Sequence, residues 1–380
     1  MSSEFRQELL KLRRALHSAP ELSRNEEKTA EIIQTHLLKY EPDELITNLG
    51  GYGLAAIFHG KSPGLSILLR CELDGLQITE DSDYDYKSRN QGVTHACGHD
   101  GHMTIIAGIA WMRRDNLPAK GSVILLFQPS EETGEGAKRV LEDSRFAGIK
   151  PDYVFALHNL PGFPLGQVIV REGVFASASK GLIIELRGAT SHAAEPEKGR
   201  SPTMAVAQLI QGLSSAPQNF VPMHENVKVT VIHAKIGEPA FGTSPGTGIV
   251  MATLRTHSDE IMDSLSQRLI AFIHKTASAY NLDVGIKWTE PFPVTVNDDD
   301  CVKIVEDSAN SIGLGTIYPE KPFPWSEDFG HFTSRFRGAL FGLGAGVDHP
   351  ALHNPDYNFP DDLIEIGIKI YGEIIRRILD

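Results

Sequence analysis

The chain has 380 residues, enough for two or three domains at about 150 residues each. Hydrophobic residues make up 41% and charged residues 22%, a globular composition that excludes extensive disorder and collagen-like sequence. The formal net charge of −13 disfavours binding to nucleic acid or to anionic membrane surfaces.

The few cysteines indicate a reducing compartment. There are three, Cys71, Cys97 and Cys301, and an odd, sparse set does not form a secreted disulfide framework. Residues 5–16 have the apolar spacing of an amphipathic helix, with Ser2 or Ser3 as N-cap, so we expect no signal peptide. The apolar runs are of strand length, so no membrane span is expected. The predicted location is the cytoplasm.

From residue 54 to residue 160, short apolar runs alternate with helical patterns. Strands are predicted at 65–69, 123–127 and 153–157, and a helix at about 103–114. The first two strands contain consecutive rather than alternating apolar residues, as in strands buried on both faces. This part of the chain is therefore predicted to be an α/β sheet with helices on both faces.

The pattern changes near residue 180. Strand, helix, two strands, helix and strand follow one another up to residue 288, which is the order of a ferredoxin-like α+β unit. Alternation then resumes with a helix at about 300–311, a strand at 339–343 and a last helix after Asp362. We expect one domain made of 1–179 and 290–380, interrupted by a second domain at 180–289.

The densest group of potential metal ligands lies just before the predicted helix at 103. His95, Cys97, His99 and His102 occur within eight residues on a glycine-containing turn. Thiolate and imidazole are ligands that suit zinc and similar divalent ions. The alternative is a turn whose histidines only cap the following helix, and His102 in particular fits that role.

Other potential ligands follow predicted strands. Glu131 and Glu132 come after the strand at 123–127, where open α/β sheets bind ligands, and the alternative is a solvated pair of carboxylates. One glutamate can bind metal while the other takes a proton from water. His158 follows the strand at 153–157, and His353 lies in a loop before the last helix. Either histidine alone would more often be structural.

Taken together, these residues resemble a known family. The sequence looks like a metallopeptidase family 20 amidohydrolase, of the branch with hippurate hydrolases, aminoacylases and plant indoleacetyl-amino-acid hydrolases. The matching motifs, in chain order, are Ala96-Cys97-Gly98-His99-Asp100-Gly101-His102, Phe127-Gln128-Pro129-Ser130-Glu131-Glu132, Leu157-His158, Ser191-His192-Ala193-Ala194, Glu327-Asp328-Phe329 and Leu352-His353-Asn354-Pro355.

The resemblance implies a fold and a set of roles. The fold is a zinc-peptidase-like catalytic domain with a mixed sheet, plus an inserted lid and dimerisation domain. Glu131 would be the general base, Asp74 would orient His99, and His192 would stabilise the oxyanion in a neighbouring active site across a homodimer. The implied ligands of two divalent metal ions are Cys97, His99, Glu132, His158 and His353.

Some positions depart from the family pattern. Glu72 stands where Asp is usual, Gln77 where Pro is usual, and Gly242 where an Asn near the substrate carboxylate is usual. The usual specificity for N-acyl amino acids therefore needs its own test. Arg187 and Arg255 are further candidates for pairing with a substrate carboxylate.

The sequence thus predicts a cytoplasmic, homodimeric, binuclear amidohydrolase for a small N-acyl amino acid or related compound. Zinc or manganese is expected, with nickel or cobalt as alternatives. Three alternative functions remain open: a dipeptidase using the same site, a cysteine amidase with Cys97 as nucleophile, and a non-catalytic metal- or ligand-binding protein.

Overall fold

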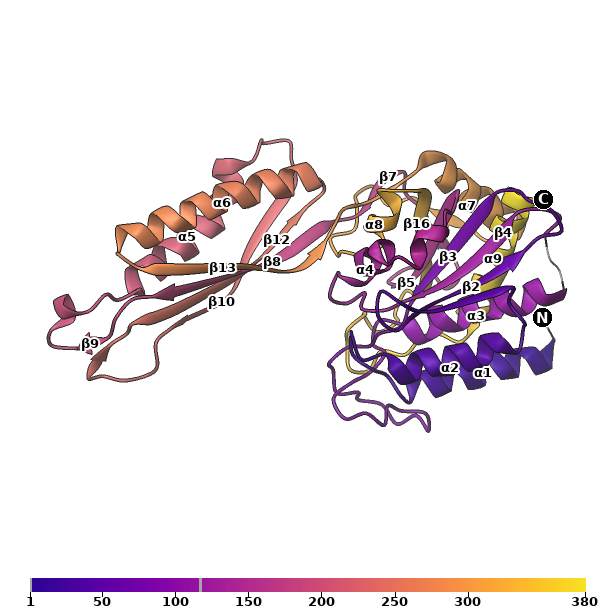
Figure 1. Ribbon diagram of the computed structural model, residues 1–380, viewed down its shortest axis with the longest axis horizontal. Helices are drawn as coiled ribbons and strands as arrows, with labels where there is room; N and C mark the ends of the chain where they lie inside the picture. Colours follow the sequence, from indigo (N-terminus) through magenta and orange to yellow (C-terminus); the bar gives the residue numbers. More distant parts are fainter. Residues whose placement is uncertain (1, 116–117) are drawn as a thin grey trace. The chain divides into compact units, whose positions relative to one another are not determined.

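The computed structural model describes residues 2–115 and 118–380, and the chain forms two compact units (Figure 1). The first unit consists of Met1–Phe175, Thr295–Pro322 and Glu327–Asp380. The second consists of Ala176–Val294 and the short segment Phe323–Ser326, which no sequence pattern indicated.

The first unit is a mixed α/β structure, as predicted. Its elements before the second unit are α1 (Ser3–His17), α2 (Glu27–Leu38), β1 (Glu44–Leu49), β2 (Gly53–His59), β3 (Ser66–Glu72), α3 (His99–Asp115), β4 (Ser122–Gln128), α4 (Gly136–Glu142), η1 (Phe146–Gly148), β5 (Tyr153–Pro161), β6 (Val168–Ile169) and β7 (Gly173–Ala176). Those after it are β14 (Thr295–Asn297), α7 (Asp299–Ser311), β15 (Thr316–Ile317), α8 (Gly330–Thr333), β16 (Arg337–Gly346) and α9 (Asp362–Leu379).

Two element boundaries differ from the predicted ones in ways that matter for the site. Helix α3 begins at His99, four residues before the predicted start, because the turn at Gly98 (φ 90°) leads directly into it. Strand β5 continues to Pro161, so His158 lies within the strand and not after it. The N-terminal helix agrees with prediction, since the Ser2 hydroxyl accepts a hydrogen bond from the Phe5 backbone N–H.

The main sheet has eight strands in the order β1-β2-β4-β3-β5-β16-β6-β15. Strand β3 is at the centre and pairs in parallel with both β4 and β5. Since parallel strands share a direction, the carboxyl ends of β4, β3 and β5 meet at one edge. The segments that follow these three strands are therefore brought together there.

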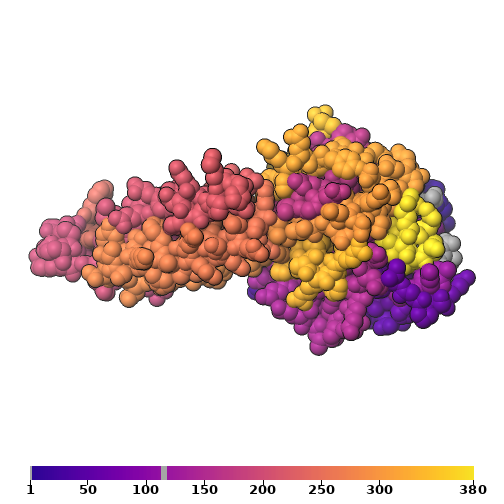
Figure 2. All heavy atoms as spheres, turned by 90° about the horizontal axis from the view of Figure 1, so that it is seen from above, coloured from indigo at the N-terminus to yellow at the C-terminus, as the bar shows by residue number. Residues whose placement is uncertain are grey.

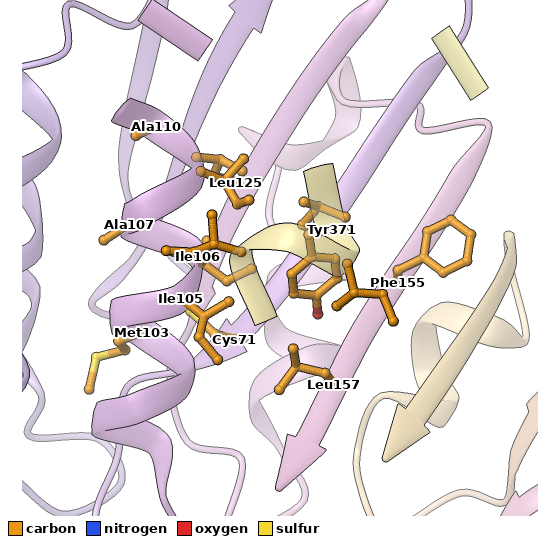
Figure 3. Close-up of a cluster of buried hydrophobic side chains, with 14 of the residues drawn as sticks. Cys71, Met103, Ile105, Ile106, Ala107, Ala110, Leu125, Phe155, Leu157 and Tyr371 are labelled. Carbon is orange, nitrogen blue, oxygen red and sulfur yellow. The ribbon is translucent and has the colours of Figure 1, made fainter. Parts of the chain in front are cut away.

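Successive side chains of the central strands face opposite sides of the sheet. Ile67 and Leu69 of β3 belong to the large hydrophobic core, together with residues of α1, α2, α3, α7 and α9. Figure 3 shows Ile105 and Ile106 of α3 and Tyr371 of α9 in this cluster of buried side chains. On the opposite face, Arg70 binds Glu327 and Asp328, just before α8, so this face is also covered.

The second unit has ferredoxin-like topology. Its elements are β8 (Ala178–Arg187), β9 (Ser191–His192), η2 (Pro196–Lys198), α5 (Thr203–Phe220), β10 (Val227–Ile236), β11 (Thr243–Ser244), β12 (Thr247–Thr256), α6 (Asp259–Ala279) and β13 (Asp283–Phe292). The four long strands form an antiparallel sheet in the order β10-β12-β8-β13.

The helices α5 and α6 cover one face of this sheet, and Figure 2 shows their atoms on the surface of the unit. Leu182 and Ile184 of β8, Val250 of β12, Leu209 of α5 and Leu269 of α6 are members of one separate hydrophobic core. Within the described part of the chain, no helix has the length and apolar character needed to cross a membrane.

Candidate metal centre

The carboxyl edge of the main sheet gathers most of the predicted site residues. Asp74 follows β3, Glu131 and Glu132 follow β4, and His158 lies near the end of β5. Cys97 and His99 lie at the start of α3, and His353 lies in the loop before α9. The fold thus brings residues from five separate segments to one place.

Five predicted metal ligands form two overlapping groups. One group is Cys97, His99 and His158, and the other is Cys97, Glu132 and His353. Within each group the potential ligand atoms lie within 4.8 Å of one another. Because Cys97 belongs to both groups, its thiol lies within reach of both ligand sets, and the five residues together would suit two neighbouring ions.

The distances within and between the two groups are those of side chains that surround one compact centre. Cys97 Sγ lies 3.4 Å from His158 Nε2, and Glu132 Oε1 lies 3.9 Å from His99 Nε2. His353 Nε2 lies 3.9 Å from Glu132 Oε2. Two ligands at ~2.1 Å from one ion in tetrahedral geometry are about 3.4 Å apart. A modest contraction of the site around an ion would therefore satisfy coordination.

Hydrogen bonds fix the orientation of two imidazole rings. His99 Nδ1 lies 2.8 Å from the Asp74 carbonyl oxygen, and His158 Nδ1 lies 2.8 Å from the Asn159 carbonyl oxygen. Carbonyl oxygens only accept, so each Nδ1 carries the proton and each Nε2 has its lone pair. That lone pair is the one required for metal ligation.

Asp74 acts through a different atom from the one expected. Its carbonyl oxygen binds His99, whereas the carboxylate Oδ1 is 3.7 Å from the same ring nitrogen. The carboxylate Oδ2 instead accepts hydrogen bonds from the Glu132 backbone N–H (3.0 Å) and the Ser23 hydroxyl (2.7 Å). Asp74 thus holds both His99 and Glu132.

Several buried polar atoms in the cluster are suited to binding a cation. His99 Nε2, Asp74 Oδ1 and Glu132 Oε1 have no hydrogen-bond partner among the described residues. Buried polar groups are rarely left unsatisfied in native proteins. A divalent cation would satisfy the histidine nitrogen and the glutamate oxygen, so the residues present fit a metal centre.

Burial and the crowding of carboxylates also shift the pKa values of the site residues. Burial, followed by neighbouring carboxylates, raises the pKa of Glu131, Glu132 and Cys97. Burial lowers the pKa of His158 to about 3. These shifts reflect negative groups crowded together in a site of low polarity, and positive charge at the centre would favour their ionised forms.

Glu131 lies between the cluster and a second group of buried charges. Its carboxylate is 3.9 Å from His99 Nε2 and also within 4.8 Å of Glu327 and Asp328. Arg70 binds Glu327 (2.8 Å) and Asp328 (2.6 Å), and it also contacts Glu72. One fully buried guanidinium therefore compensates several carboxylates beside Glu131.

His102 is placed behind the cluster. Its Nε2 accepts a hydrogen bond from the Asn159 backbone N–H (3.2 Å), so Nδ1 carries the proton and donates to Glu72 (2.7 Å). Both ring nitrogens are thus occupied, and His102 connects β3 with β5 rather than offering a metal ligand. Glu72, at the position where Asp is usual, is fully buried between His102 and Arg70.

His353 is the most exposed of the predicted ligands, with 52% of its side chain accessible. Its backbone adopts φ 66°, a left-handed conformation that is costly for a residue other than glycine. The loop is nevertheless fixed, because the His353 N–H donates to Ala96 O (2.9 Å) and the Asp81 N–H donates to Pro355 O (2.8 Å). Strain at this position is consistent with a ligand held in a defined orientation.

His192 belongs to the second unit, whereas the cluster residues belong to the first. It is exposed on the short strand β9, which pairs with β11 so that His192 is opposite Thr243. The Ala194 backbone N–H donates to its Nδ1 (3.1 Å), so Nε2 carries the proton and is a hydrogen-bond donor. The neighbouring Gly242 carbonyl accepts from the Ala193 N–H (3.0 Å).

The two arginine candidates have partners within the second unit. Arg187 pairs with Glu185 at the surface, with 3.1 Å between nitrogen and oxygen. Arg255 donates to Pro324 O (2.9 Å) and to Ser326 Oγ (3.1 Å), and so binds the short segment that joins this unit from a distant part of the sequence.

The roles of Arg70, and of Glu26 and Ser23, were not predicted from the sequence. The Arg70 network could have been inferred, since a charged residue in a strand buried on both faces requires a partner. Glu26 and Ser23, which bind the segments around Glu131 and Asp74, had no such sequence signal, because their partners lie 104 and 51 residues away.

The family model for peptidase family M20/M25/M40 matches residues 68–377. The chain belongs to this family. A solved Bacillus subtilis structure, described as a dinuclear metal-binding peptidase of the M20 family, matches this M20 chain with a TM-score of 0.83 and 25% identity, covering 100% of this chain and 99% of the other.

Curated relatives have similar lengths. The N-acetyl-L-cysteine deacetylase of Bacillus subtilis (strain 168) is 32% identical over 384 residues, covering all of this M20 chain and 90% of the relative. The N-acetyldiaminopimelate deacetylase of Bacillus licheniformis is 30% identical, with 96% of each chain covered. The hippurate hydrolase of Campylobacter jejuni is 28% identical, with 98% and 97% covered. All three names describe hydrolysis of an amide bond.

Proposed function

We propose that this M20 family chain is a binuclear metal-dependent amidohydrolase that cleaves the amide bond of small N-acyl amino acids. The observation that carries the proposal is the pair of ligand groups sharing Cys97, with Glu131 beside them. The three relatives named above act on N-acetylated amino acids or hippurate, which supports this substrate class.

The ligands proposed for the two ions are Cys97, His99, Glu132, His158 and His353. Divalent ions at such a site polarise the scissile carbonyl and lower the pKa of water. Cysteine ligation favours zinc, and manganese, nickel and cobalt accept the same donor set. The Bacillus subtilis M20 structure, which is described as dinuclear metal-binding, supports the proposal of two ions in this chain.

Glu131 is the proposed general base. Its carboxylate is buried and lies 3.9 Å from His99 Nε2, beside the ligands without belonging to either of the two groups that share Cys97. Glu131 would accept a proton from the attacking water and deliver it to the nitrogen of the leaving amine. Arg70, which binds Glu327 and Asp328 nearby, favours the ionised form of the Glu131 carboxylate, although burial and the neighbouring carboxylates raise its pKa.

His192 is the proposed oxyanion donor. Its Nε2–H is exposed and its tautomer is fixed by the Ala194 N–H, so a donor is ready without rearrangement. We propose a homodimer in which His192 of one protomer serves the site of its partner. The cytoplasm is the proposed location, since the three cysteines are buried and unpaired.

A cysteine amidase is less well supported. Cys97 and His158 are 3.4 Å apart, as a nucleophile and its base would be. However, the pKa of Cys97 is raised and that of His158 is lowered to about 3, mainly by burial. Both shifts oppose the thiolate–imidazolium pair that such an enzyme uses. Glu132 and His353 would also have no role.

The proposal can be tested by turnover of N-acetyl-L-cysteine, N-acetyldiaminopimelate and hippurate after loading with Mn²⁺ or Zn²⁺. We expect release of acetate or benzoate, abolished by a chelator and restored by metal. A dipeptide panel run in parallel distinguishes a dipeptidase. Chelator-resistant turnover that a thiol alkylator stops would favour the cysteine amidase, and metal binding without turnover of any substrate would favour a binding protein.

A further inference from the structure

The residue before Glu131 has an unusual backbone conformation. Ser130 is fully buried and adopts φ 55°, in the left-handed region that residues with a Cβ rarely occupy. Such conformations persist only where surrounding contacts stabilise them, and they cluster at functional sites. The contacts of Ser130 therefore show what maintains this part of the site.

The left-handed turn explains how two adjacent glutamates face one centre. In an extended strand, successive side chains point to opposite faces. Here Glu131 Oε2 and Glu132 Oε1 are each 3.9 Å from His99 Nε2. Strand β4 ends at Gln128, and Ser130 is the left-handed residue between the end of that strand and the turn that carries the two glutamates.

Glu26, immediately before α2, provides two contacts to Ser130, whose carbonyl oxygen also accepts a hydrogen bond from the Gly136 N–H (3.0 Å). Its Oε1 accepts hydrogen bonds from the Ser130 N–H (2.7 Å) and from the Ser130 hydroxyl (3.1 Å). The Ser130 hydroxyl oxygen also accepts from the Arg24 N–H (3.0 Å). Glu26 is fully buried, so these bonds are shielded from water.

The turn that carries Glu26 is itself fixed to the sheet. The Gly75 N–H donates to Glu21 O (2.8 Å), and the Ser23 hydroxyl donates to Asp74 Oδ2 (2.7 Å). The same Asp74 oxygen accepts the Glu132 N–H. Residues 21–26 thus reach the Ser130–Glu132 segment in two ways: Glu26 binds Ser130 directly, and Ser23 binds the Asp74 oxygen that also accepts the Glu132 N–H.

We propose that Glu26 is a positioning residue for the metal centre. It stabilises the left-handed conformation of Ser130 and thereby directs both the Glu131 and the Glu132 carboxylates toward His99. This role rests on the proposed function, because it assumes that Glu132 binds metal and that Glu131 acts as base.

The test is a double-mutant cycle with two readouts. The Zn²⁺ dissociation constant, from competition with a chromophoric chelator, and kcat are measured for the wild type, Glu26→Ala, Ser130→Gly and the double variant. Glycine adopts φ 55° without a steric cost, so it no longer needs Glu26. Glu27→Ala is the matched control, since Glu27 is the exposed neighbour.

We expect Glu26→Ala to weaken zinc binding and lower kcat by at least ~10-fold in the wild-type background, and by less than about 3-fold in the Ser130→Gly background. Glu26→Gln, which retains an acceptor oxygen, should recover most of the loss. Equal losses in the two backgrounds, or no loss in either, would overturn the positioning role. A wild-type chain that binds no zinc would overturn the proposed function and this role with it.

Should Glu26→Ala not fold, Ser130→Ala and Ser130→Gly answer the same question. Alanine keeps the strained conformation and the N–H bond to Glu26 but loses the hydroxyl bond, whereas glycine removes the strain. Zinc should therefore bind more weakly to Ser130→Ala than to Ser130→Gly. Equal zinc affinity in these two variants would overturn the proposal.

Discussion

The metal-centre residues and His192, on the β9–β11 strand pair, differ in how their side chains are held. Cys97, His99 and His158 are buried at strand and helix ends, and the rings of His99 and His158 are fixed by backbone carbonyls. His192 is exposed on a two-residue strand, and one hydrogen bond from Ala194 N–H fixes its ring. The first region is preorganised by burial, and the second is available to a surface outside its own unit.

This difference agrees with the two proposed roles, metal binding by the buried residues and oxyanion stabilisation by His192. Holding two ions requires several ligands within a few tenths of an ångström, which buried elements of a rigid sheet provide. A donor that reaches a substrate in another protomer has to remain exposed. Mutations in the two regions should therefore have separable effects on metal content, turnover and stability.

The largest effect is expected for Glu131→Gln. We predict that kcat falls by ~10³-fold or more, because the amide cannot take a proton from water. Metal content should remain near the wild-type level, because the five proposed ligands are unchanged and glutamine keeps an oxygen at position 131, where the carboxylate is grouped with His99 and Glu132. Turnover assays and inductively coupled plasma mass spectrometry measure the two quantities. Activity within about tenfold of wild type would contradict its role as base.

A substitution of His192 should have a different effect. His192→Ala is expected to lower kcat by ~10²-fold, because a donor to the oxyanion is lost. Metal content and melting temperature should stay unchanged, since the side chain is exposed and makes only a local hydrogen bond. His224→Ala is the matched control, because His224 is another exposed histidine of the second unit. Unchanged kcat in His192→Ala, or loss of metal, would contradict the separation of the two regions.

The free energy of unfolding should depend on pH through the protonation of His17, which binds Asp100 beside the proposed metal ligand His99. Burial alone would lower the pKa of His17, but Asp100 (2.8 Å) and Glu80 (3.3 Å) outweigh burial and raise it to about 9. A raised folded-state pKa means that the charged pair stabilises the fold fully below about pH 6.5. That stabilisation is lost as the pH rises through about 9.

Chemical denaturation of the wild type and His17→Gln at pH 6 and pH 10 measures this effect. The difference in unfolding free energy should shrink by about 3 kcal/mol between the two pH values, from a pKa shift of this size. A difference that is independent of pH would show that His17 does not carry the charge in the folded state.

The smallest effect is expected at Gly242, beside His192. A Cβ at this position meets no atom of the described residues within 4 Å, so Gly242→Asn should change the melting temperature by less than ~1 °C. If the added amide reaches the substrate carboxylate, KM for N-acyl amino acids should fall by about 2–10-fold. An unchanged KM would mean that position 242 does not contact substrate.

The strength of the sequence prediction depends on where each residue's partners lie. His99 and Glu132 were identified because ligand residue types occur at strand and helix ends, where patterns and family motifs are informative. The roles of Glu26 and of the Asp74 carbonyl depend on long-range backbone geometry, and no local pattern encodes a hydrogen bond to a residue 104 positions away. The second unit's long strands and helices were predictable from periodicity, whereas segment 323–326 joins it only through tertiary contacts.

The most direct test of the account is metal stoichiometry by mass spectrometry after saturation with Zn²⁺ or Mn²⁺ and desalting. We predict about two ions per wild-type chain, and a clear loss in the Cys97→Ala, His158→Ala double variant, because Cys97 belongs to both ligand groups. Retention of no metal by the wild type, or equal retention by the double variant, would contradict a binuclear centre built on Cys97.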